Sequence, residues 1–180
     1  MPGLFKCWRK GNVGIINAPG TGIADDKAIY SYVDKMIKFY LDEEPKLKQV
    51  HTFLCRKKIH KDHVIENISK LVVKPANASG GYGIMIGPKA PLKERQEVIN
   101  KIKKNPREFI AQPLEILSTA PTITENDIEP RHLDLRPFVL SGKTSYVTTA
   151  GLTRVALRKG STIVNSSQGG GSKDTLIVDM

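Results

Sequence analysis

The sequence predicts an α+β fold, and two patterns along its 180 residues support this class. Up to residue 117, amphipathic stretches with helical spacing alternate with short apolar runs. In the remainder, short apolar runs follow one another and are separated by turn residues such as Gly142 and Gly160. Runs of the second kind are typical of antiparallel strands. We therefore expect a mixed first part and a mainly β second part.

The N-terminal part is expected to contain a strand followed by a helix. Residues 13–17, "VGIIN", form an apolar run that ends at the turn sequence "APGTG". Apolar residues then recur at helical spacing, namely Ile29, Val33, Ile37 and Tyr40. Asp25 and Asp26 precede them, where a helix dipole favours negative charge. The pattern predicts one helix over residues 27–41.

The middle of the chain is expected to contain a β-hairpin. The apolar run 71–75 ends at Pro75 and a glycine-rich loop, and residues 82–87 are its expected antiparallel partner. The other elements expected before residue 117 are a strand at 50–55, a short helix at 61–71, an amphipathic helix at 92–105 with Val98, Ile99 and Ile102 inward, and a strand at 109–116.

The last third of the chain predicts an antiparallel meander after a loop at 118–130. Its strands are expected within 132–140, 144–151, 154–157 and 161–165, and a glycine-rich loop begins at 166. The expected division is into an α/β segment at 1–70, a lid-type lobe with a lysine and a glycine-rich loop at 71–117, and an antiparallel β lobe at 118–180.

Composition limits the partners of the chain. The net charge of +10 attracts polyanions, which include nucleic acid, nucleotide phosphates and anionic lipid. Aromatic residues make up only 6% and no RNA-binding signature occurs, so nucleic acid is the less favoured partner despite the basic stretch 92–104. No apolar run has a membrane-spanning length and no secretory signal is recognised, so we expect a cytoplasmic protein without a membrane partner. The oligomeric state is left open.

The two cysteines indicate a reducing compartment, because they form no disulfide framework. Cys55, His60 and His63 have the spacing C-x4-H-x2-H, which is a weak zinc pattern because it lacks a fourth ligand. An exposed position at the start of a helix is the favoured interpretation of both histidines.

The stretch "LVVKPANASGGYGIMIG" interrupts a core-like run with a cation and a loop almost free of side chains. Lys74 lies near the end of the first strand, and Ser79, Gly80, Gly81 and Gly83 follow that strand. Glycines let the backbone approach an anion, and an ammonium group beside them suits a triphosphate. The alternative is a tight hairpin whose lysine stem packs along the surface.

Two later strands carry charged residues in apolar surroundings. Asp134 and Arg136 are two residues apart, so a strand would project both side chains to one side. Asp134 would then face a metal or a hydroxyl and Arg136 a phosphate. The alternative is a cross-strand salt bridge on an exposed face. Arg154 lies within "LTRVAL" and needs an anionic partner, either a protein carboxylate or a ligand phosphate. Asn165 ends a predicted strand, and a glycine-rich segment that contains Lys173 follows it. This segment is either a loop that contacts a ligand or a flexible tail.

The order of several motifs resembles the circularly permuted ATP-grasp proteins, which are similar to peptide ligases. These motifs are, in chain order, the lysine and glycine-loop hairpin, "FIAQ", "DLRPFV", "TRVAL" and "VNSSQGGGSKDT". The upstream "GNVGIINAPGTGIADDKAIYSYV" and "YLDEEP" also match that family, so the resemblance covers nearly the whole chain. The resemblance implies an ATP-grasp fold, in which two α+β lobes hold ATP between them. It further implies that the chain is the C-terminal part of a longer protein.

The resemblance implies a role for each candidate residue. Lys74 matches the lysine that contacts the phosphates, the glycines of the loop match a flexible lid, and Gln112 lies in the hinge strand beside adenine. Arg136 and Arg154 match arginines near the γ-phosphate and the acyl group. The remaining cofactor-binding matches are Ser79, Asp134, Asn165 and Lys173.

The resemblance also implies an activity. The parent protein would be an ATP-dependent carboxylate–amine ligase that uses Mg²⁺, forms an acyl phosphate and takes a small-molecule or peptide carboxylate and amine as substrates. The metal ligands are unknown, because the family's Glu-x-Asn pair has no convincing match here and is expected upstream in longer members. The alternatives are a non-catalytic nucleotide-binding remnant and, less favoured, a basic nucleic-acid-binding domain.

Overall fold

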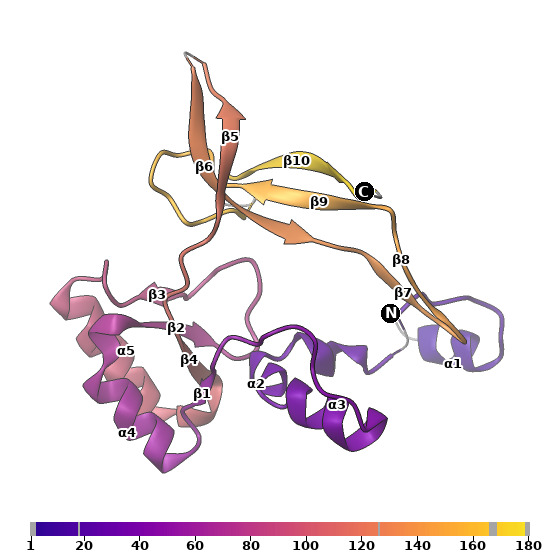
Figure 1. Cartoon of the computed structure of the whole chain (residues 1–180). Helices are drawn as coiled ribbons and strands as arrows, with labels where there is room; N and C mark the ends of the chain where they lie inside the picture. Colours follow the sequence, from indigo (N-terminus) through magenta and orange to yellow (C-terminus); the bar gives the residue numbers. More distant parts are fainter. Residues whose placement is uncertain (1–2, 18, 126, 166–168, 179–180) are drawn as a thin grey trace. The chain divides into compact units, whose positions relative to one another are not determined.

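The computed structural model describes residues 3–17, 19–125, 127–165 and 169–178. Contacts between residues divide the chain into two compact units, unit 1 at Met1–Leu114 and unit 2 at Glu115–Met180. Figure 1 labels the helices and strands in chain order. Helices together with antiparallel sheets confirm the α+β class. In the part of the chain that is described, no helix is both long and apolar enough to cross a bilayer.

Unit 1 is built on a four-stranded antiparallel sheet with the strand order β1-β4-β2-β3. The strands are β1 (Phe53–Leu54), β2 (Leu71–Pro75), β3 (Met85–Ile86) and β4 (Phe109–Pro113). The hairpin expected from the apolar runs is confirmed, because β2 pairs with β3 across the glycine-rich loop. Gly87 follows β3 where a Cβ atom would lie 1.9 Å from the carbonyl oxygen of Ile68, so only glycine is accommodated there.

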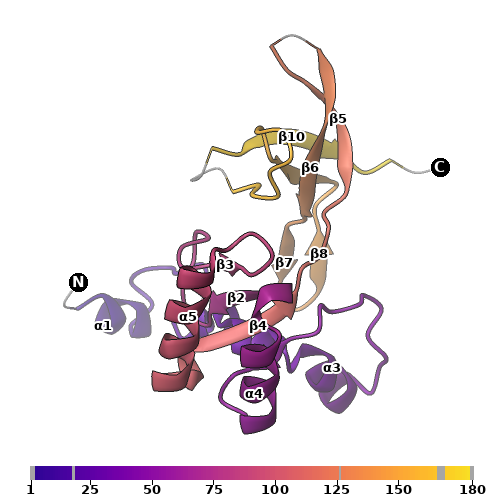
Figure 2. The same ribbon diagram turned by 90° about the vertical axis from the view of Figure 1, so that its left-hand side faces the viewer.

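Helices α4 (Lys58–Glu66) and α5 (Leu92–Lys104) cover one face of this sheet (Figures 1 and 2). The short 3-10 helices η2 (Ile68–Lys70) and η3 (Pro106–Glu108) lead into β2 and β4. The main core joins the two helices to the sheet, with Val64 and Ile102 fully buried. Ile102 therefore points inward, as the spacing of apolar residues predicts.

The N-terminal region differs from its prediction. The elements are α1 (Leu4–Arg9), η1 (Thr21–Asp25), α2 (Lys27–Tyr30) and α3 (Val33–Leu41), and none of them contains a buried residue. The expected strand at 13–17 is wrong, because the run finds no partner strand and ends at Asn17, whose φ of 65° is left-handed. The expected helix over 27–41 is interrupted where the Ser31 hydroxyl donates to the carbonyl of Ala28, a local bond that competes with helix continuation.

A small cluster lies on the sheet face opposite α4 and α5. Leu54, Ala76 and Ile110 are buried there, and Ala28 and Tyr32 pack against them. Ala28 of α2 and Tyr32, which lies between α2 and α3, are thus the parts of the N-terminal region that pack against the sheet. Lys74 and Gln112 alternate with core residues of β2 and β4, so they belong to the same face.

Unit 2 consists of an antiparallel sheet with the order β10-β9-β6-β5 and a separate hairpin β7-β8 (Figure 1). The strands are β5 (Thr119–Ile123), β6 (Ile128–Arg136), β7 (Val139–Ser141), β8 (Ser145–Val147), β9 (Ala150–Val155) and β10 (Gly171–Leu176). All pairings are antiparallel, as the alternating pattern predicts.

Two predictions for unit 2 are wrong. Residues 118–130 are not a loop, because β5 pairs with the first half of β6. Residues 161–165 are not a strand, because the Ser161 hydroxyl accepts a hydrogen bond from the backbone N–H of Ile163 at 3.1 Å and closes a local turn.

Candidate functional site

The glycine-rich loop between β2 and β3 borders a cavity of about 420 Å³ in unit 1. Three of the predicted residues, Ser79, Gly80 and Gly81, line it together with Asp25 and Lys27. The φ angles of Gly80 and Gly81 are 70° and 79°, in the left-handed region that disfavours a side chain. The loop conformation that shapes this cavity therefore depends on glycine.

Gly83 closes the loop against the preceding strand. Its φ is 71°, and a Cβ atom built on it would lie 2.9 Å from Cγ of Pro75. The residue does not line the cavity, so its contribution is to the path of the loop.

Lys27 is a cation of this cavity that no motif in the sequence singles out. Its backbone N–H donates to the carbonyl of Ala76 at 2.9 Å, and its Nζ donates to the carbonyl of Ala78. It follows Asp26, the N-cap residue whose Oδ1 accepts from the N–H of Ala28 at 2.7 Å. A lysine in the first turn of a helix is disfavoured by the dipole, and this mismatch is the sequence signal that could have identified it.

Lys74 and Gln112 lie side by side in the sheet. The Nζ of Lys74 donates to Oε1 of Gln112 at 2.7 Å, and Nε2 of Gln112 donates to Oγ1 of Thr52 at 2.8 Å. Gln112 and Thr52 are buried and Lys74 is half-buried. The three residues form a connected polar chain across β4 and β2 to the segment before β1.

No carboxylate balances the charge of Lys74 among the described residues. Burial lowers the pKa of Lys74, and the nearby positive charge of Lys27 lowers it further. Asp25 shares the lining of the loop cavity with Lys27, but neither lysine forms an ion pair with a described carboxylate. An anion would therefore be attracted by the two cations.

In unit 2 the structure brings Asp134 and Arg154 together. Nε of Arg154 donates to Oδ1 of Asp134 at 2.8 Å, and Nη2 donates to Oδ2. The side chains are 28% and 24% exposed, and the ion pair raises the pKa of Arg154. The anion that Arg154 requires is thus a protein carboxylate. Among the described residues, none accepts a hydrogen bond from Nη1, so this part of the guanidinium can still meet a ligand.

The strand register decides which other residues share this face. Asp134 pairs with Arg154 and Arg136 pairs with Leu152, so both arginines and the carboxylate lie on one side of the sheet. Lys173 pairs with Thr153, whose side chain points to the opposite side, and its Nζ donates to the carbonyl of Pro121. The register therefore separates Lys173 from the arginines.

Asn165 is half-buried and lies before the glycine-rich segment. Its carbonyl oxygen accepts a hydrogen bond from the N–H of Gly170 at 3.0 Å, which closes the backbone into a loop. Residues 166–168 of this segment lie outside the described residues.

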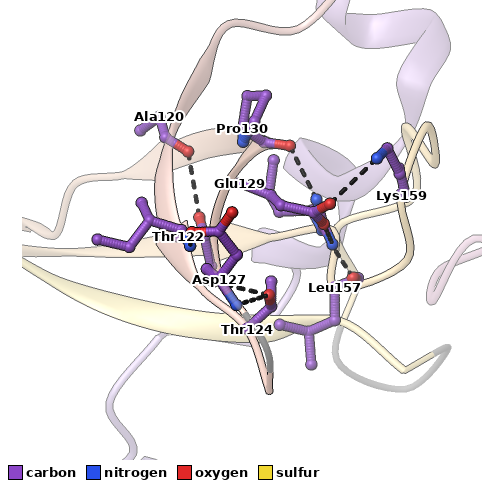
Figure 3. Close-up of polar contacts among 10 residues, drawn as sticks. Ala120, Thr122, Thr124, Asp127, Glu129, Pro130, Leu157 and Lys159 are labelled. Carbon is purple, nitrogen blue, oxygen red and sulfur yellow. Dashed lines mark hydrogen bonds and ion pairs between the residues drawn. The ribbon is translucent and has the colours of Figure 1, made fainter.

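Arg131 is a buried cation of β6 that the sequence patterns do not identify. Its guanidinium donates to the carbonyls of Leu157 at 2.9 Å and Pro130 at 3.1 Å and to the carboxylate of Glu129. Lys159 also pairs with Glu129, at 3.0 Å (Figure 3). Because Arg131 is buried and each of its three guanidinium nitrogens donates to a protein group, we assign it to the support of the sheet.

The weak zinc pattern is not assembled in the structure. The described residues contain no group of three or more His, Cys, Asp or Glu side chains that could hold a metal ion. Nδ1 of His60 accepts from the N–H of Leu54 at 3.0 Å. His63 packs its ring against Phe53, with ring centroids 4.6 Å apart.

Similar proteins are found in several bacteria. The chain is 52% identical over 179 residues to an uncharacterized protein of Synechocystis, covering 99% of this chain and 37% of that protein. It is 49% identical over 177 residues to an uncharacterized protein of Mycobacterium tuberculosis, covering 98% of this chain and 32% of that protein. A Frankia casuarinae protein named "Putative glutamate--cysteine ligase 2-2" is 48% identical over 174 residues, which cover 97% of this chain and 20% of that protein.

The chain thus spans between 20% and 37% of the length of these relatives. A model of the family described as circularly permuted ATP-grasp type 2 matches residues 1–156. That match includes the lysine and glycine-loop hairpin and both arginine-bearing strands, and it confirms the resemblance seen in the sequence. The chain belongs to the circularly permuted ATP-grasp family, type 2.

Proposed function

We propose that this chain supplies ATP-binding residues of an ATP-dependent ligase that joins a carboxylate to an amine. The observation that carries the proposal is the cavity beneath the glycine-rich loop, with Lys27 on its lining and Lys74 close by without a carboxylate. A polyphosphate would supply the negative charge that these two lysines lack. Membership of the ATP-grasp family supports ATP as the source of that polyphosphate.

In the proposed reaction, a carboxylate oxygen attacks the γ-phosphorus of ATP, and the bond from that phosphorus to the β–γ bridging oxygen breaks. The resulting acyl phosphate is attacked by the nitrogen of an amine, which loses a proton as inorganic phosphate departs. Lys27 and Lys74 would neutralise charge on the phosphates, while Arg136 and Arg154 would act on the transferring group. Removing one such donor commonly costs about 3 kcal/mol in the barrier.

The described residues fit the phosphates of ATP better than they fit Mg²⁺. The loop cavity suits phosphates, but no described cluster of acidic or histidine side chains suits Mg²⁺. A cytoplasmic location is part of the proposal and agrees with the two free thiols, Cys7 and Cys55.

The second candidate function is a nucleotide-binding remnant without turnover, and the described residues, which hold no metal-binding cluster, are compatible with both candidates. The two candidates agree on binding and differ on chemistry. Release of inorganic phosphate from ATP in the presence of carboxylates and amines separates them, because only the ligase would show it.

Thermal-shift titration with a non-hydrolysable ATP analogue tests the shared part. Analogue at about 100 times its dissociation constant should stabilise the protein by about 2.7 kcal/mol. Lys74→Ala and Lys27→Ala should each weaken this effect. In the intact parent protein, Lys74→Ala should also abolish turnover. Lys103→Ala is the control, since Lys103 is exposed on α5 on the other side of the sheet. Equal shifts in all four proteins would refute the assignment of the lysines.

A further inference from the structure

Lys74 lies at one end of a chain of hydrogen bonds whose direction is fixed at each step. The hydroxyl of Thr52 has one proton and donates it to the carbonyl of Val50 at 3.0 Å. The oxygen of this hydroxyl is left to accept, and it accepts from Nε2 of Gln112 at 2.8 Å. The amide of Gln112 therefore turns Oε1 towards Lys74, whose Nζ donates to it at 2.7 Å.

The same chain reaches the helix that carries the second cation of the loop cavity. The N–H of Val50 donates to the hydroxyl oxygen of Tyr30 at 2.8 Å, and Tyr30 is the last residue of α2. Lys27 is the first residue of that helix, and its N–H donates to the carbonyl of Ala76, which follows β2. Both lysines are thus attached to one hydrogen-bonded frame within unit 1.

The acceptor that meets Lys74 is neutral. Gln112 and Thr52 are 9% and 7% exposed, so their hydrogen bonds are largely shielded from water. A neutral acceptor orients an ammonium group and leaves its charge uncompensated, whereas a carboxylate at the same position would balance that charge. Burial and the positive charge of Lys27 lower the pKa of Lys74, which agrees with a cation that no protein anion balances. An amide at position 112 therefore directs Lys74 and keeps its charge for an anion.

We propose that Gln112 and Thr52 are positioning residues for polyphosphate binding, because they hold the ammonium group of Lys74 in place and leave its charge to the ligand. Each end of the Gln112 amide already has a protein partner, so we assign this side chain to Lys74 and not to the adenine base. The identity of the polyphosphate as that of ATP rests on the proposed function, whereas its contact with Lys74 does not.

Two probes distinguish this role from a contact with the base, namely inorganic triphosphate and a non-hydrolysable ATP analogue. Calorimetric titration compares the 180-residue chain with Gln112→Glu, which places a carboxylate beside Lys74 at nearly constant shape. The variant should bind both probes at least about tenfold more weakly, because the carboxylate balances the charge of Lys74. If only the ATP analogue is weakened, Gln112 contacts the nucleoside and the inference fails. It also fails if neither probe is weakened.

Gln96→Glu is the control for the added negative charge. Gln96 is exposed on α5, which covers the other face of the sheet, so this variant should bind both probes as the wild type does. An equal loss of affinity in Gln96→Glu and Gln112→Glu would show an effect of net charge alone and would refute the positioning role.

Thr52 tests the same chain without a change of charge. Thr52→Val removes the hydroxyl at similar size, so the amide of Gln112 loses the acceptor that orients it. Both probes should bind about three- to tenfold more weakly, and Thr52→Ser, which keeps the hydroxyl, should recover most of this loss. Equal affinities of Thr52→Val and Thr52→Ser would contradict the inference.

Thr122→Val is the matched control for Thr52→Val. Thr122 is also buried, and its hydroxyl donates to the carbonyl two residues before it at 3.1 Å, but it belongs to β5 of unit 2. Loss of this hydroxyl should leave the affinity for both probes unchanged. A loss as large as that of Thr52→Val would mean that the effect does not depend on Lys74.

Melting temperatures separate positioning from a purely structural role. Gln112→Met removes both hydrogen bonds of the amide and adds no charge. It should melt at a lower temperature than Gln112→Glu, whose carboxylate can pair with Lys74 and accept from Thr52. Gln112→Met should nevertheless bind triphosphate more tightly than Gln112→Glu, because Lys74 keeps an uncompensated charge. If the affinities instead follow the melting temperatures, the two residues only support the fold.

The outcome is separable from that of the proposed function. If the wild-type chain binds the ATP analogue and the variants bind it equally well, this inference fails while the proposed function stands. If triphosphate binds with the expected dependence on Gln112 but the ATP analogue does not bind, the inference stands and the assignment to ATP fails. If neither probe binds to the wild-type chain, both are refuted.

Discussion

The two units are stabilised in different ways. Thirteen of the sixteen buried apolar residues that the structure describes lie in unit 1, where two helices and the N-terminal region cover both faces of a sheet. Among the described residues of unit 2, this class comprises Val155, Ala156 and Val164. Its sheet instead carries the ion pair of Asp134 with Arg154 and the network around Arg131. Hydrophobic burial dominates the first unit, and strand pairing with polar contacts dominates the second.

The units also differ in how they treat a partly buried cation. Lys74 of unit 1 faces a neutral amide, and no described carboxylate balances it. Arg154 of unit 2 is held by a carboxylate in a two-point contact. A cation without a carboxylate partner is typical of a binding site, because an anionic ligand can pair with the positive charge. A balanced cation contributes first to stability.

The largest effect should come from the core of unit 1. Ile102→Ala removes a fully buried side chain and leaves a cavity, so we expect a loss of about 2–5 kcal/mol in the free energy of unfolding. Urea unfolding followed by circular dichroism measures it. Leu92→Ala on the same helix is the control, since Leu92 is 78% exposed and the change should stay within about 0.5 kcal/mol. Similar losses in both variants would contradict the packing of α5 described here.

A smaller loss is expected from the ion pair of unit 2. Arg154→Met leaves the partly buried carboxylate of Asp134 without its donor, which should cost about 1–3 kcal/mol. Arg158→Met, three residues after the end of β9, replaces an exposed arginine and should be nearly neutral. The same urea measurement compares them. If the two variants are equally stable, unit 2 does not depend on this ion pair.

The network around Glu129 should make unit 2 sensitive to acid. Hydrogen bonds from Arg131 and then Lys159 lower the pKa of Glu129 from its ordinary value of 4.5. The stability that this carboxylate adds is therefore complete above pH 4.5 and is lost as the pH falls through the lowered pKa. The difference in unfolding free energy between wild type and Glu129→Gln should shrink over that range. A difference that stays constant down to strongly acidic pH would argue against the network.

The smallest effect on stability is expected in an experiment that uses the two thiols of unit 1 to report whether its core is closed. Burial raises the pKa of Cys55 to about 11, whereas Cys7 is exposed. At pH 8 the thiolate fraction of Cys55 would be only about one in a thousand, so it should react far more slowly than Cys7 with Ellman's reagent. In Cys7→Ser, the remaining thiol should react only when unit 1 opens. A rapid reaction of Cys55 in the folded protein would contradict the closed core.

Local patterns were sufficient where an element is defined by its own residues. The spacing of apolar residues identified α5, and the two apolar runs around the glycine-rich loop identified the hairpin β2-β3. The loop glycines were also readable, because left-handed φ angles favour that residue type. The order of motifs along the chain, from the lysine and glycine-loop hairpin to "DLRPFV" and "TRVAL", indicated the family that the family match confirms.

Other features depend on neighbours that are distant in the sequence. An apolar run becomes a strand only where a partner pairs with it, so residues 13–17 failed and β5 appeared in a predicted loop. The carboxylate partner of Arg154 was fixed by strand register. The position of Lys27 beside the glycine-rich loop was fixed by the contacts of α2 with Ala76, the residue that follows β2. Composition and spacing determined the elements and the candidate cations, and tertiary packing decided which charges are balanced, because burial and pairing exist only in the folded chain.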